Sequence, residues 1–203
     1  GTNLHLPTIM HRRPILIRDD HSSLAAAILS LPPLRDDDAA EGHLLLRLSL
    51  LHALRSSDAA ARERIRHRIA VTVAIEHAVT AGVSPSVAVR RAWKSQCGDV
   101  QLAMPELLGE TATHIDPALA SGAVRQRAAL ERLLPMLTGA ADAARSTVLR
   151  RIAKWSRRPV VAFTFSSATA AALYDRLRHV PGVALLDGGA EVEVARPPAE
   201  QFL

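Results

Sequence analysis

The sequence has few aromatic residues, one cysteine and no long apolar run. Its 203 residues include three Phe, two Trp and one Tyr, so Leu, Ala, Val and Ile must build most of the core. The single cysteine, Cys97, excludes an intrachain disulfide and a zinc site made from several cysteines. No apolar run approaches the ~20 residues that cross a bilayer, and no signal-peptide pattern is present. We therefore expect a cytoplasmic protein without a membrane partner.

Lysine is also scarce. Only two of the 25 basic residues are lysines, so 23 are arginines, against 20 acidic residues and a net charge of +5. This balance is compatible with an anionic partner such as nucleic acid, but it does not establish one. The joint excess of Arg and Ala is typical of GC-rich coding, so each arginine says less about function than usual.

The motifs of the common enzyme classes are missing. Lys94-Ser95 has no glycines before it, so there is no phosphate-binding loop. The sequence contains neither an Asp-Glu-x-His magnesium motif nor a Gly-x-Ser-x-Gly nucleophile motif. The nine histidines lack the i, i+4 spacing of a zinc enzyme. The sequence therefore predicts no catalytic residue, no metal ligand and no cofactor in this segment.

Hydrophobic periodicity predicts a mainly helical protein up to about residue 155. The predicted helices cover residues 22–31, 43–56, 58–81, 85–94, 117–137 and 142–155. Ser57 or Asp58 is expected to start the third of these helices. On the second helix, the apolar stripe is expected to include Leu44, Leu45, Leu48 and Leu51, together with Leu54 or Leu46.

The pattern changes after residue 158. Residues 160–165 and 182–186 read as short buried strands, and 167–179 reads as a helix between them. A strand, a helix and a strand in this order predict one parallel βαβ unit. We therefore expect a helical region over 1–157 and an α/β portion over 158–203, an incomplete RecA-like lobe because an open sheet usually has more strands.

Residues 74–94 are compatible with a DNA-binding helix-turn-helix, with Gly82 at the turn. Such a motif would place Ser86, Arg90 and Arg91 toward the major groove. An ordinary helical hairpin with a solvated basic face gives the same pattern, because glycine turns between helices are common. Both interpretations stay open, and we favour the hairpin.

Five cations precede the first predicted strand: Arg150, Arg151, Lys154, Arg157 and Arg158. They are the candidate nucleic-acid-binding residues, because clustered Arg and Lys neutralise phosphates. A solvated helix end explains the cluster as well, since cations suit the C-terminal end of the helix dipole. We expect Trp155, within the cluster, to anchor the helix rather than to stack on a base.

Three stretches follow one another near the C-terminus: Val160-Val161-Ala162-Phe163-Thr164-Phe165, Thr169-Ala170-x-x-Leu173 and Gly182-Val183-Ala184-Leu185-Leu186-Asp187-Gly188. This order resembles the start of the second RecA-like lobe of superfamily 2 helicases, and the Swi/Snf-like branch above all. Upstream, the leucine-rich stretch 44–60 resembles the helical segment between the lobes of bacterial Swi/Snf-like ATPases. Residues 191–198 depart from the family pattern.

The resemblance implies a fragment of a motor whose parent uses ATP and Mg²⁺ and acts on duplex DNA. The family's phosphate loop, magnesium carboxylates and arginine finger have no counterpart here, so the segment alone is expected to be inactive. The motif residues that map are Thr164, Thr169, Asp187 and Gly188. Ser166 and Ser167, at free helix N-terminal amides, suit a phosphate or simply cap the helix.

Three hypotheses of different classes remain. In the favoured one, the chain supplies the inter-lobe helices and part of the second lobe of an ATP-dependent DNA helicase or translocase, with the missing motor lobe as a partner. The second is a helix-turn-helix regulator that uses residues 74–94. The third is a structural helical interaction domain.

Overall fold

The computed structural model describes residues 14–15, 17, 21–35, 40–82, 117–156, 159–186 and 193–194. Over these residues the protein is mainly helical, as predicted. The elements in chain order are α1 (Ser22–Leu29), α2 (Ala40–Ser56), α3 (Asp58–Thr80), α6 (Pro117–Leu133), the 3-10 helix η2 (Leu134–Met136), α7 (Ala140–Trp155), α8 (Ser167–Leu177), β1 (Ala184–Leu185) and β2 (Glu193–Val194).

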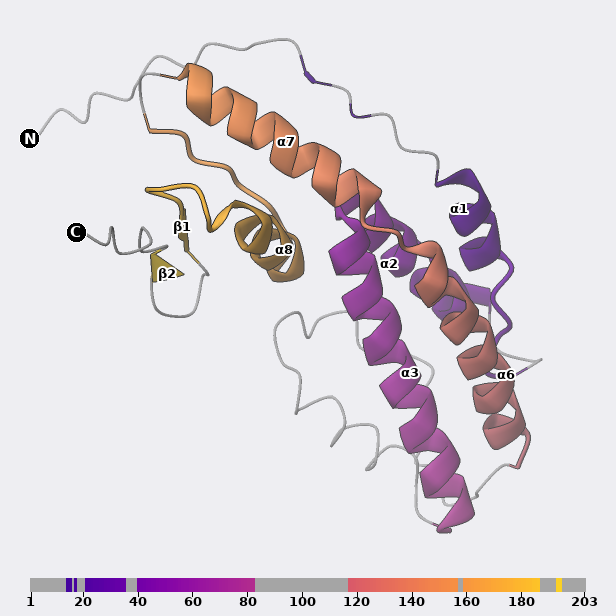
Figure 1. Ribbon diagram of the computed structural model, residues 1–203. Helices are drawn as coiled ribbons and strands as arrows, with labels where there is room; N and C mark the ends of the chain where they lie inside the picture. Colours follow the sequence, from indigo (N-terminus) through magenta and orange to yellow (C-terminus); the bar gives the residue numbers. More distant parts are fainter. Residues whose placement is uncertain are drawn as a thin grey trace, which may run out of the picture.

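Helix α3 is the centre of the arrangement, because it contacts α2, α6, α7 and α8. Helix α6 lies along α3, and α1 packs beside α2 and α6 (Figure 1). Helix α7 continues beyond the N-terminal end of α3, and α8 lies against both helices (Figure 1). The C-terminal part of the described chain is thus attached to the helical part mainly through α8.

The core of the helical part is aliphatic, as the composition predicts. One cluster joins α1, α2, α3 and α6 and is formed by Leu24, Ile28, Leu31, Leu50, Leu54, Ala61, Ile65, Leu130, Leu133 and Leu137. A second, smaller cluster joins Leu34 to α3 and α6 through Val71, Ile75 and Ala123. Both clusters include side chains of α3, so this helix takes part in both hydrophobic contacts.

Helix α6 and the connection after α1 approach each other closely at Gly122. A Cβ atom placed on Gly122 would lie 1.7 Å from the carbonyl oxygen of Leu34. Only glycine leaves room for the backbone at this distance. Nearby, the amide of the fully buried Gln126 donates to the carbonyl of Pro32 at 2.9 Å and accepts from Arg68 Nε at 2.7 Å.

The predicted apolar stripe of α2 is partly wrong. Leu44, Leu45 and Leu48 are exposed, at 50%, 41% and 51% of their surface. Leu54, one of the two alternatives for the stripe, is buried, and so is Leu50, which the predicted stripe did not include. Leucines occur on more than one side of this helix, so periodicity alone does not identify the inner face. Arg47 donates to the carbonyl of Leu31 at 2.8 Å, which helps to turn the Leu50 side toward α1.

The predicted parallel strand pair is not formed among the described residues. Residues 160–165 belong to no strand. Strand β1 pairs antiparallel with β2, with Ala184 opposite Val194 and Leu185 opposite Glu193. The reason is local: β2 follows β1 closely in the chain, so closing this hairpin costs less entropy than pairing across α8.

Candidate nucleic-acid interface and the adjacent polar junction

Three of the five residues of the basic cluster lie on the last two turns of α7. Arg150, Arg151 and Lys154 are all exposed, and none forms an ion pair with another residue in the described ranges. Arg150 and Lys154 are four residues apart and so share one face of the helix. Arg157 and Arg158 lie outside the described residues. The described cations therefore form a solvated positive helix end, which is available to an anion.

Trp155 does not anchor α7. Its side chain is 75% exposed, and the guanidinium carbon of Arg151 lies 5.8 Å from its ring centroid, within the range of a cation–π contact. The expectation of an anchor is wrong because α7 extends past the helices that could cover its end (Figure 1). An exposed indole beside three cations suits a nucleic-acid surface better than a core.

The segment between α7 and α8 exposes apolar side chains. Val160 and Val161 are 42% and 67% exposed, and Phe163 and Phe165 are 94% and 100% exposed. The motif residue Thr164 is also exposed, and its hydroxyl accepts a 3.3 Å hydrogen bond from the amide of Ser166. Four large apolar side chains are therefore exposed between positions 160 and 165.

The predicted site residues at the start of α8 differ in exposure and in their contacts. Ser166 is the N-cap, and its hydroxyl accepts from the amide of Thr169 at 3.4 Å, so helix capping is realised here. Ser167 is exposed, whereas Thr169 is buried. The motif residues Asp187 and Gly188 lie outside the described residues. The structure therefore places Thr169 away from any surface at which a ligand could bind.

Thr169 instead joins a polar junction at the link between α2 and α3. Its hydroxyl lies 2.6 Å from Ser57 Oγ and 2.9 Å from Ser56 Oγ. Ser57 is the predicted N-cap of α3, and its oxygen accepts from the amide of Ala60 at 2.9 Å. Side chains separated by more than 110 residues thus meet in one buried hydrogen-bonded group.

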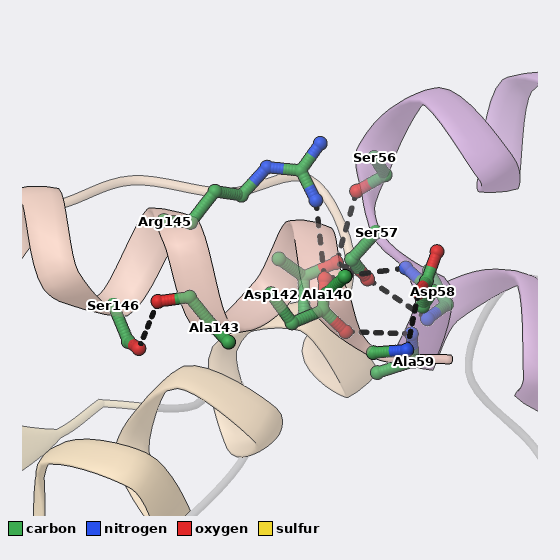
Figure 2. A network of polar contacts seen from close by, with 12 residues as sticks. Ser56, Ser57, Asp58, Ala59, Ala140, Asp142, Ala143, Arg145 and Ser146 are labelled. Carbon is green, nitrogen blue, oxygen red and sulfur yellow. Dashed lines mark hydrogen bonds and ion pairs between the residues drawn. The ribbon is translucent and has the colours of Figure 1, made fainter. Parts of the chain in front are cut away.

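Two buried carboxylates cap each other's helices in the same junction. Asp142 of α7 accepts from the amides of Asp58 and Ala59, at 3.2 and 3.0 Å, and so caps the start of α3 (Figure 2). Asp58 in turn accepts at 2.6 Å from the amide of Gly139, the N-cap of α7. Each carboxylate therefore satisfies amides that the other helix leaves open.

The remaining contacts of this junction complete its hydrogen bonding. His21, the N-cap of α1, lies 2.9 Å from the second oxygen of Asp58. Arg145 donates to Asp142 at 3.1 Å and to the carbonyl of Arg55 at 3.2 Å (Figure 2). All four carboxylate oxygens have a partner, so these two acids are built to hold helices together.

The sequence predicts a helix start at Ser57 or Asp58, and Ser57 is the N-cap, but the contacts of Asp58, Asp142 and Thr169 with distant residues were not predicted. A signal existed, because an acidic residue in the first turn of a helix, as at Asp58 and Asp142, is typical of capping. The helix partners could not be read from it, because 84 residues separate Asp58 and Asp142. A local pattern does not say which distant amide a carboxylate will meet.

Part of the predicted helix-turn-helix lies within the described residues. Residues 74–80 form the end of α3, while Ser86, Arg90 and Arg91 lie outside the described residues. The described ranges contain no group of three His, Cys, Asp or Glu side chains that could hold a metal ion. Within the same ranges, no helix is long and apolar enough to span a membrane.

Comparisons with known proteins add no assignment. No family model matches the chain, and neither a curated protein nor a solved structure matches it significantly.

Proposed function

We propose that this chain supplies the inter-lobe helices and the opening of the second lobe of a Swi/Snf-like ATP-dependent DNA helicase or translocase. The observation that carries the proposal is the segment 160–165. It is rich in β-branched and aromatic residues, and its large apolar side chains are exposed. Such a composition suits a strand that is covered on both faces within a parallel sheet.

In the proposed lobe, further strands of the parent protein pair with residues 160–165. Their pairing would satisfy the main chain of this segment, and the helices that flank such sheets would cover Phe163 and Phe165. Strand β1 already has β2 on one edge. The proposed parallel neighbour would therefore add to the other edge of β1, which gives the antiparallel hairpin a place at the side of a larger sheet.

The cations of α7 supply the proposed contact with duplex DNA. Arg150, Arg151 and Lys154 are exposed at one helix end, close in sequence to the proposed strand. In motors of this kind, phosphate contacts hold the nucleic acid without reading its sequence. ATP and Mg²⁺ belong to the parent protein in this proposal, and the chain alone is expected neither to bind nor to hydrolyse ATP.

The proposal is tested by fluorescence anisotropy with several labelled duplexes over a range of salt. The double variant Arg150→Glu, Arg151→Glu should weaken binding to all duplexes alike. The slope of log K against log salt should become shallower by about 0.9 for each phosphate that the variant no longer neutralises. The matched control is Arg66→Glu with Arg132→Glu, which reverses two exposed charges on α3 and α6.

Two results would contradict the proposed interface. One is equal weakening by the control pair, which would mean that net charge alone decides binding. The other is selective binding to one duplex that survives both double variants, which would favour the helix-turn-helix hypothesis for residues 74–94.

A further inference from the structure

We infer that Ser56, Ser57 and Thr169 form a clasp that makes α8 move together with the helical part of the protein, rather than with residues 160–165 and 178–186 on either side of α8. The inference concerns this chain alone. Its mechanical meaning in a motor rests on the proposed function, but its test does not.

The geometry of the clasp is that of strong hydrogen bonds. An O–H···O distance of 2.6 Å, between Thr169 and Ser57, is at the short end of the usual range. Ser57 and Thr169 are 1% and 4% exposed, so water does not compete for their hydroxyls. The Thr169 hydroxyl can donate to one serine and accept from the other, so all three groups are satisfied at once.

The clasp connects the start of α8 to the link between α2 and α3. Thr169 is in the first turn of α8, while Ser56 ends α2 and Ser57 caps α3. Helix α8 buries few side chains of its own, Thr169 and Tyr174 among its described residues. Helix α8 also contacts α7, where Arg176 donates to the carbonyl of Gly139 at 3.4 Å, and the clasp is its polar attachment to the link between α2 and α3.

The flanking segments are attached differently: after α8, the amides of Arg178 and Val180 donate to the carbonyls of Tyr174 and Leu177, and β1 contacts α8, so these attachments are to α8 itself. Residues 160–165 lie in no strand and are exposed throughout. After α8, residues 178–186 are exposed or half-buried, and Gly182 takes a positive φ of 81° in a turn. Movement is therefore easier in these two segments than between α8 and α3. In the proposed motor, α8 would therefore stay with the long helix α3 while the neighbouring strand segments of the second lobe move.

Hydrogen exchange measured by mass spectrometry tests the clasp on the whole chain. Thr169→Val keeps the shape of the side chain and removes its hydroxyl. We expect amide exchange in α8 to accelerate about tenfold relative to α6 of the same protein. Thr169→Ser, which keeps the hydroxyl, should stay within about threefold of the parent.

The matched control is Thr147→Val on α7. Thr147 is exposed, and its hydroxyl donates to the carbonyl of Ala143 in its own helix, at 2.9 Å. This variant should leave α8 exchange unchanged. If Thr169→Val does not fold, Ser56→Ala replaces it, with an expected acceleration of about threefold confined to α8.

Two outcomes overturn the inference. The first is equal acceleration of α8 and α6 in the variant that lacks the clasp hydroxyl, which would indicate a uniform loss of stability. The second is an α8 response no larger than that of Thr147→Val. Because neither measurement uses DNA, failure of the clasp and failure of the proposed DNA interface are separate results.

Discussion

Helix α3 is held in place by different interactions at its N-terminal end and along the rest of its length. Along most of its length, α3 packs through aliphatic side chains against α2 and α6, with Ile65, Val71 and Ile75 fully buried. At its N-terminal end, the contacts to α7 and α8 are mostly hydrogen bonds between capping groups. Apolar packing tolerates many partners of the right size, whereas the polar end accepts only groups that match donor to acceptor.

The polar end also gathers the starts of four helices. His21, Ser57, Gly139 and Ser166 are the N-caps of α1, α3, α7 and α8, and each lies in or next to the junction. Helix N-termini carry partial positive charge and would repel one another. The carboxylates of Asp58 and Asp142 offset this charge, which explains why two acids are buried together.

The largest loss of unfolding free energy is expected at Gly122, where α6 lies close to the backbone of Leu34. Gly122→Ala would place a methyl group 1.7 Å from a backbone oxygen, so α6 must move away from Leu34. We expect a loss of more than about 3 kcal/mol of unfolding free energy, above the usual cost of overpacking. Urea denaturation measures it. The control Val124→Ala, exposed on the same helix, should change stability little, and equal losses would contradict the close approach.

The inner face of α2 can be tested next. Leu50→Ala should cost about 3 kcal/mol, since Leu50 is fully buried among α1, α3 and α6. Leu48→Ala, on the same helix but 51% exposed, should cost less than about 0.5 kcal/mol. Chemical denaturation of both variants gives the comparison. A larger loss of stability for Leu48→Ala than for Leu50→Ala would support the apolar stripe that the sequence predicted.

A somewhat smaller loss is expected at the polar end. Asp142→Ala leaves the amides of Asp58 and Ala59 without their acceptor, at a cost of about 2 kcal/mol. Thermal and urea unfolding should both report it. Asp175→Ala removes an exposed acid from α8 and serves as the control. Added formate should restore part of the loss more than chloride at the same ionic strength, because helix N-termini bind small anions.

If Asp142→Ala lost no more stability than Asp175→Ala, the reciprocal caps would be dispensable. The polar end of α3 would then be held by packing, and its contrast with the aliphatic end would disappear.

Most helices could be predicted from the sequence because their signals are local. The start of α3 at Ser57 and that of α8 at Ser166 follow from capping residues a few positions from the first turn. The buried face of α2 was predicted only in part, since leucines lie on both sides of the helix and packing against α1, α3 and α6 decides which of them are buried.

Contacts between residues far apart in the sequence could not be predicted, for a different reason. Thr169 stood out only through its family resemblance, which gave no hint of Ser57, 112 positions away. The strand pairing failed because an apolar run such as 160–165 says that a strand is favourable but not where its neighbour comes from. Local chemistry predicts elements, and long-range matching of donors and acceptors decides how they join.

The exposed segment between α7 and α8 has a practical consequence for the isolated chain. An extended apolar stretch whose main chain is unpaired is a template for intermolecular β-pairing. Because Phe163 and Phe165 are almost fully exposed, copies of the chain can associate through this stretch. Concentrated preparations will therefore tend to aggregate, and a charged residue at position 163 would act as a gatekeeper that keeps the chain in solution.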